Sequence, residues 1–157
     1  MNTTAAPTPP SVSTNALLPI AVGGLVAGTL DLTQALLLFG SNTPQVIAAG
    51  LLGRQVIHDG GPFTYALGVG LHYFIATTAT AIYYTASRRL TFLREHPVVC
   101  GPFYGIAVEL VMRLVVLPLS ALHSKGPYKH EDLALGLVVH MALIGLPIAL
   151  SIRRFSR

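Results

Sequence analysis

Charged residues are scarce in this 157-residue sequence, where Asp, Glu, Lys and Arg together make up 10% of the chain. A soluble domain carries about 25%, so the composition argues against a soluble globular protein. Hydrophobic residues reach 52%, and the mean hydropathy is +0.64. Several apolar runs have roughly the 20 residues that a helix needs to cross a bilayer. These features indicate an integral membrane protein with one domain.

Cysteine is also nearly absent, because Cys100 is the only one. A single cysteine excludes an intrachain disulfide and a thiolate metal cluster. The sequence contains no Walker loop, no HExxH and no GxSxG motif, and its basic residues form no stripe long enough to follow a phosphate backbone. We therefore assign no catalytic residue, metal or cofactor and expect no nucleic-acid partner. The expected partners are the lipid bilayer and other membrane proteins or a second copy of the chain.

The apolar segments predict an all-α fold, a four-helix membrane bundle with one short additional helix. Residues 1–15 are rich in Thr, Pro, Ser and Ala without periodicity, and we expect a disordered tail there. Residues 44–58 follow a Thr-Pro start that suits a helix, but they are too few to span a bilayer. This segment is predicted to be an interfacial or re-entrant helix. The four spans are expected at about residues 17–39, 62–87, 98–120 and 131–152.

The basic residues predict the orientation of the bundle. With four spans, both termini and the loop after the second span lie on one side of the membrane. That side carries six arginines, whereas the other side carries one arginine and two lysines. The positive-inside rule then places both termini in the cytoplasm. The six arginines are Arg88, Arg89, Arg94, Arg153, Arg154 and Arg157, and the opposite residues are Arg54, Lys125 and Lys129.

Every predicted span carries an ionisable side chain at depth, although a charge there costs about 3 kcal/mol or more. A rise of about 1.5 Å per residue puts these side chains at similar depths, and we call them the polar layer. Glu109 and Arg113 are four residues apart, hence on one helix face and within pairing distance. We expect Arg113 to be neutralised by Glu109, by Asp31 or by both. The polar layer consists of Asp31, His72, Glu109, Arg113 and His140.

Glycine precedes a polar-layer residue by three or four positions on each span. Glycine on the same helix face lets another helix backbone approach closely, so the polar layer is predicted to lie at tightly packed interfaces. The predicted packing positions are Gly24, Gly28, Gly68, Gly101, Gly105 and Gly136.

Three interpretations of the polar layer remain open. The leading one is interhelical hydrogen bonding in a non-catalytic membrane subunit or stabiliser. The alternative is a proton- or ion-conducting bundle, because intramembrane acids and histidines commonly mark such paths. In the third, His72 and His140 are axial ligands of a haem. A water-filled cavity that touches the acids and histidines would favour conduction. A dry polar layer in which every group is paired would favour the structural role of interhelical hydrogen bonding. The conducting path would use Asp31, Glu109, His72 and His140.

Five segments within about residues 20–153 carry a resemblance to known proteins: GGLVAGTLDL, VIAAGLLGRQ, LHYFIATTATAIYY, GPFYGIAVELVMRLVVLPLS and GLVVHMALIGLPIAL. They resemble small four-span bacterial inner-membrane proteins of unknown function. More distantly, they are similar to the YagU-type inner-membrane family, whose name is linked to acid resistance. The resemblance implies a bacterial inner membrane, leaves the activity open, and supplies no catalytic residues.

Overall fold

The computed structural model describes residues 16–156, so the tail predicted for residues 1–15 lies outside the described range. Within that range the chain is helical without strands, which confirms the all-α prediction. Two long helices are continuous, and two are built from three consecutive segments each. The long helices are α1 (Leu17–Phe39), α4 (Pro62–Arg89), α6 (Pro97–Val111) with η1 (Met112–Val116) and α7 (Leu117–Leu119), and α8 (His130–Val139) with η2 (His140–Gly145) and α9 (Leu146–Phe155). The short helices are α2 (Thr43–Leu52), α3 (Val56–Asp59) and α5 (Phe92–Glu95).

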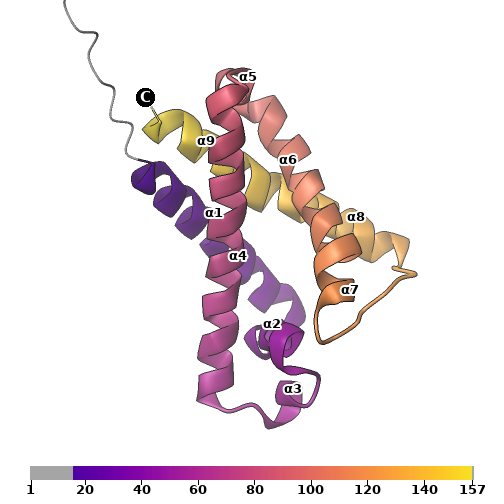
Figure 1. Ribbon diagram of the computed structural model, residues 1–157. Helices are drawn as coiled ribbons and strands as arrows, with labels where there is room; N and C mark the ends of the chain where they lie inside the picture. The colour runs from indigo at the N-terminus through magenta and orange to yellow at the C-terminus, as the bar shows by residue number, and fades with distance from the viewer. Residues whose placement is uncertain (1–15, 157) are drawn as a thin grey trace, which may run out of the picture.

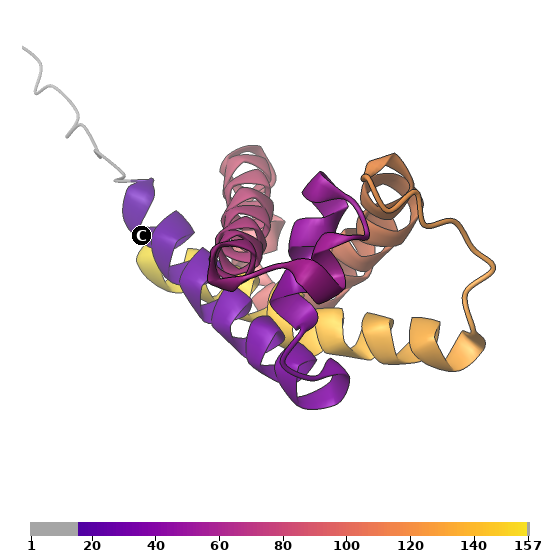
Figure 2. The ribbon, with the colours of Figure 1, turned by 90° about the horizontal axis from the view of Figure 1, so that it is seen from below.

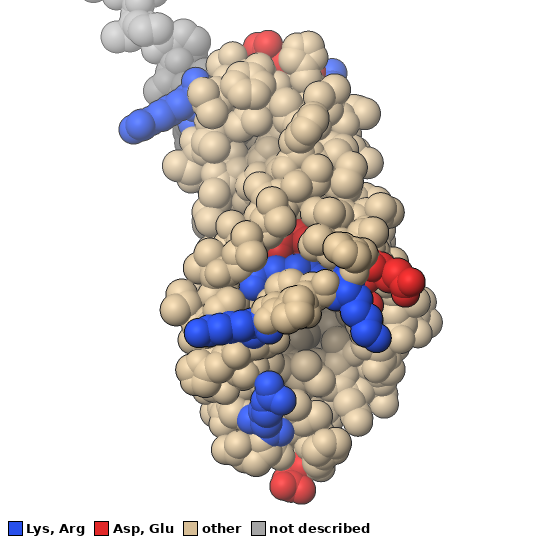
Figure 3. Space-filling view, turned by 90° about the vertical axis from the view of Figure 1, so that its right-hand side faces the viewer, with Lys and Arg blue, Asp and Glu red and all other residues tan. Residues whose placement is uncertain are grey.

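All four long helices have the length and apolar composition needed to cross a membrane. Their outward side chains are large and apolar: Leu37, Phe63 and Leu119 are 79–81% exposed. Extensive apolar surface is costly in water and normal in lipid. In Figure 3, charged side chains lie at both ends and in a band across the lower half of one face, with surface free of Lys, Arg, Asp and Glu above the band. The four long apolar helices therefore indicate a membrane protein.

The long helices pack in the order α4, α1, α9, α6. Helix α1 contacts both α4 and α9, while α6 contacts η2 and α9. Helices α4 and α6 meet at α5 and diverge from there (Figure 1). The start of α1, the end of α9 and α5 lie at one end of the bundle, which we call the terminal end. Helices α2 and α3 lie at the other end, where α2 packs along α4 (Figures 1 and 2).

Close glycine contacts hold these helices together. A Cβ added at Gly24 would lie 2.7 Å from the Thr77 hydroxyl, and one added at Gly28 would lie 2.9 Å from the Tyr73 ring, both on α4. Glycine thus allows α1 and α4 to approach closely. The same holds for Gly68 against α2, Gly101 against Gly145, Gly105 against η2, and Gly136 against Glu109.

The short helix predicted over residues 44–58 is divided in the structure. Helix α2 ends at Leu52 because Gly53 adopts φ +94°, a left-handed conformation that glycine adopts without a Cβ penalty. The chain then resumes as the single turn α3. Helix α2 is also joined to the loop after α7, since the Ala121 N–H donates to the Gly50 carbonyl at 2.8 Å.

Segments η1 and η2 are π-helical turns, in which the bond reaches back five residues. The Leu117 N–H donates to the Met112 carbonyl, and the Leu146 N–H donates to the Met141 carbonyl. A proline stands two residues after the end of each turn: Pro118 after η1 and Pro147 after η2. Proline lacks an N–H and its ring clashes with the carbonyl four residues earlier, and the wider turn accommodates both effects. The π turn η1 begins about one and a half turns before Pro118 and includes Arg113.

Candidate functional site

Glu109 is the most deeply buried member of the polar layer. Its residue surface is 4% exposed, and its carboxylate forms an ion pair with the Arg113 guanidinium one helical turn away. Arg113 also donates from Nη2 to the Asp132 carbonyl at 2.8 Å, and its guanidinium stacks 4.8 Å from the centre of the Tyr128 ring. The arginine is therefore neutralised by a carboxylate and enclosed by Tyr128 from the loop before α8 and by Asp132 from the first turn of α8.

His140 joins Glu109 from the opposite helix. Its Nδ1 lies 3.3 Å from Glu109 Oε2 and 3.0 Å from the Gly136 carbonyl. Because a carbonyl oxygen only accepts hydrogen bonds, Nδ1 carries the hydrogen in this geometry. Nε2 of a neutral ring is then free to accept a proton.

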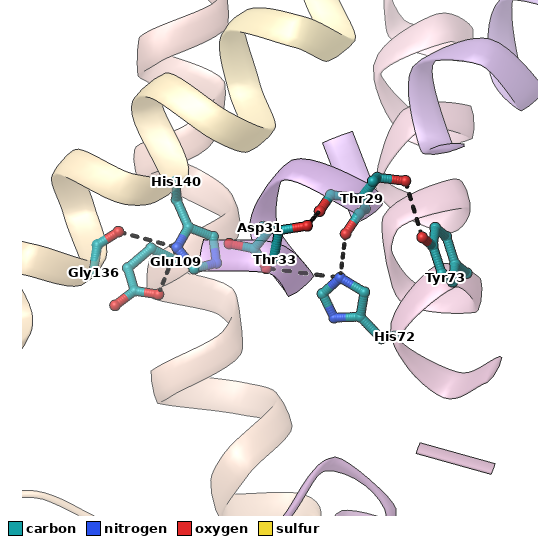
Figure 4. A network of polar contacts seen from close by, with 9 residues as sticks. Thr29, Asp31, Thr33, His72, Tyr73, Glu109, Gly136 and His140 are labelled. Atoms are coloured by element: carbon teal, nitrogen blue, oxygen red, sulfur yellow. Dashed lines mark hydrogen bonds and ion pairs between the residues drawn. The ribbon is translucent and has the colours of Figure 1, made fainter. Parts of the chain in front are cut away.

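Asp31 and His72 form the second part of the polar layer, between α1 and α4. Nε2 of His72 donates to the Gly28 carbonyl at 2.9 Å and lies 3.9 Å from Asp31 Oδ2. Figure 4 shows Asp31 between the rings of His72 and His140. Asp31 therefore lies beside His72 at more than hydrogen-bond distance, and residues 16–156 contain no ion pair between Asp31 and Arg113.

A cavity of about 340 Å³ connects the two parts, and we call it the acid–histidine cavity. Its lining on α1 runs from Asp31 to Phe39, about 12 Å along the helix axis. It therefore extends from the middle of the bundle to the end away from the chain termini. The polar side chains that line it belong to Asp31, Gln34, Glu109, Arg113, Asp132 and His140.

Toward the terminal end, close backbone packing limits the space beyond Glu109. A Cβ at Gly105 would overlap the His140 carbonyl, and one at Gly101 would lie 2.9 Å from the Gly145 carbonyl. Helix α6 thus lies directly on η2 without room for a side chain between them. The acid–histidine cavity therefore approaches Glu109 and His140 from the other end.

The cavity lining is acidic. Asp31 and Glu109 each contribute a carboxylate at depth, and Arg113 contributes one positive charge. With neutral histidines and without the exposed Asp132, these three side chains carry one uncompensated negative charge, which is costly at low dielectric. Binding one proton or one monovalent cation would neutralise this charge.

The arrangement does not favour the haem interpretation. Haem ligation requires both imidazoles to face an open space from opposite sides. Here the Asp31 side chain occupies the space between the two rings (Figure 4). Across residues 16–156, no group of three or more His, Cys, Asp or Glu side chains has a metal-binding arrangement.

Three residues of the site were missed by sequence reasoning. Gln34 follows Asp31 by three positions and shares its helix face, a spacing that was readable from the sequence. The backbone carbonyl of Asp132 and the ring of Tyr128 hold Arg113. No sequence signal indicates these two contacts, because they depend on the path of the loop before α8.

Comparisons with known protein families, curated proteins and solved structures give no match for this chain. Its function is therefore argued from the geometry of the site.

Proposed function

We propose that this chain is a non-catalytic membrane protein that binds protons in the acid–histidine cavity from one side of the bilayer. The observation that supports this is the cavity that joins Asp31, Glu109 and His140 to one end of the bundle. Intramembrane acids and histidines that face a cavity commonly serve proton transfer. His72 lies outside the lining and contributes by holding Asp31.

The acid–histidine cavity and the contact between His140 and Glu109 supply a route for the proton. A proton that enters along the cavity reaches Asp31 or Nε2 of His140. The protonated imidazole lies against Glu109, since its Nδ1–H is 3.3 Å from that carboxylate. The tight contact between α6 and η2 makes this a binding site reached from one side, and conduction would require that contact to open.

Carboxyl modification tests the proposal. We expect a lipid-soluble carbodiimide, which reacts with protonated carboxyl groups, to label Glu109 or Asp31 increasingly as the pH falls. Mass spectrometry of the full-length protein in nanodiscs locates the label, and Glu109→Gln and Asp31→Asn verify the assignment. Exposed Glu95 serves as the internal control with a water-soluble carbodiimide. Absence of label on both acids at every pH, with Glu95 labelled, contradicts the proposal.

A structural role is the second candidate, and the pairing within the polar layer favours it. Both acids, Arg113 and both histidines each have a polar partner. Interhelical hydrogen bonds of this kind hold membrane bundles together, and the chain would then be a subunit or stabiliser of a larger assembly. Unlabelled acids in the carbodiimide experiment, together with unfolding of the Glu109→Gln variant, would support this role.

For the location we propose a bacterial inner membrane with both termini in the cytoplasm. Six arginines on the side of the termini against three basic residues on the other support this orientation. We expect green fluorescent protein fused after Arg157 to fluoresce and alkaline phosphatase at the same position to be inactive. Active phosphatase would reverse the orientation, and the acid–histidine cavity would then open toward the cytoplasm.

A further inference from the structure

A second polar pocket lies at the terminal end of the bundle, between α5 and the end of α9. Its volume is about 330 Å³, and it is separate from the acid–histidine cavity. Three of its residues belong to or adjoin α5, and two lie at the end of α9. The lining residues are Thr91, Arg94, Glu95, Arg153 and Ser156.

Two buried donors in this pocket have no hydrogen-bond partner among residues 16–156. They are Nε of Arg94 and Oγ of Ser156, and Ser156 is only 6% exposed. Buried donors are normally satisfied, so the pair requires an acceptor that residues 16–156 do not supply. Two arginines against Glu95 give the pocket one net positive charge. An anion with several acceptor oxygens satisfies these requirements, and arginine forms strong charge-assisted bonds with phosphate.

The surroundings of α5 indicate where the phosphate comes from. Phe92 and Leu93 line a separate apolar groove of about 580 Å³, together with Val99, Phe103 and Tyr104. The same short helix therefore lines a polar pocket and an apolar groove. It also connects two spans at the end of the bundle (Figure 1). This combination is typical of a segment at the boundary between lipid headgroups and acyl chains.

We propose that the pocket binds the phosphate of an anionic phospholipid through Arg94, Arg153 and Ser156. The net positive charge favours an anionic headgroup over a zwitterionic one. The proposal depends on the membrane placement of the spans and is independent of proton binding in the acid–histidine cavity.

Lipid binding by delipidated full-length protein, measured by native mass spectrometry, tests this inference. We expect phosphatidylglycerol to bind more tightly than phosphatidylcholine, and Arg94→Gln to weaken phosphatidylglycerol binding by about tenfold or more, the effect of losing a hydrogen bond to a charged group. Arg154→Gln is the matched control, because Arg154 lies outside the pocket lining. Equal binding of both lipids, or an equal loss in both arginine variants, overturns the proposal. If millimolar inorganic phosphate displaces phosphatidylglycerol and binds the pocket as tightly, the ligand is free phosphate and the proposal of a lipid ligand is wrong.

Ser156→Ala separates a ligand site from a structural role. An unpaired buried hydroxyl contributes nothing to folding, so the lipid-free variant should melt at or above the wild-type temperature. Added phosphatidylglycerol should raise the melting temperature of the wild type more than that of Ser156→Ala. The inference is contradicted if lipid-free Ser156→Ala melts below wild type and added phosphatidylglycerol raises both melting temperatures equally.

Discussion

Replacing Glu109 with leucine is expected to destabilise the protein by about 3–5 kcal/mol, because the change leaves Arg113 buried without its carboxylate. The remaining partners of Arg113 are the Asp132 carbonyl and the Tyr128 ring, neither of which carries a charge. Thermal unfolding in detergent micelles, followed by loss of the monodisperse peak, measures the effect.

Arg113→Leu should cost less than Glu109→Leu, because Glu109 keeps His140 at 3.3 Å and an imidazole can accept a proton. The double variant should recover most of the stability lost in Glu109→Leu, since replacing both members of a buried pair is often close to neutral. Unequal stability losses in the two single variants, with recovery in the double variant, distinguish a buried ion pair from two independent surface charges.

Asp31→Leu provides the control for the double variant. Asp31 pairs with His72, so combining Asp31→Leu with Arg113→Leu should give nearly additive losses. Recovery in that combination would make Asp31 the true partner of Arg113. If all single variants melt like wild type, the charges are in contact with water, and the acid–histidine cavity is hydrated to its full depth.

Gly68→Ala is expected to have the second large effect, about 1–3 kcal/mol or more of lost stability. A Cβ at this position would overlap the Pro44 carbonyl at the start of α2. Backbone atoms cannot move aside as the end of a flexible side chain can, so α2 must separate from α4. Unfolding in micelles and protease cleavage in the loop after α2 measure the change.

Gly70→Ala is the matched control for Gly68→Ala. It lies on the same helix, and a Cβ there would have no neighbour within 4 Å. Alanine is favoured over glycine in a helix by up to about 1 kcal/mol, so this variant should be as stable as wild type or slightly more stable. Equal melting of both variants would show that α2 does not pack against α4 at Gly68.

Local spacing was enough to predict some parts of the site. Glu109 and Arg113 pair because positions four apart share a helix face. The depths of Asp31, His72 and His140 followed from counting residues along each span. The separation of the polar layer into an α1–α4 part and an α6–η2 part was not predictable, because it depends on which helices are neighbours. The contact between Glu109 and His140 depends on the same choice.

Other features depend on interactions that local spacing does not encode. The division of the short helix at Gly53 arises from a positive φ, and glycine permits this conformation without requiring it. The acid–histidine cavity lies where α1, α6 with η1, and α8 with η2 come together, and the donors of Arg94 and Ser156 become buried only when α5 contacts α9. Each of these features arises from tertiary packing.

The π turn η2 changes the rotational phase of the fourth long helix. In a regular α-helix, residues five apart point about 140° away from each other. The wider turn completes roughly one revolution over those five residues, so His140 and Gly145 both face α6. The fourth long helix can thus present both His140, before the turn, and Gly145, at its end, to the same neighbouring helix, α6. Deleting one residue from this turn would rotate the ring of His140 out of alignment with Glu109 and leave the contact between Gly101 and Gly145 intact.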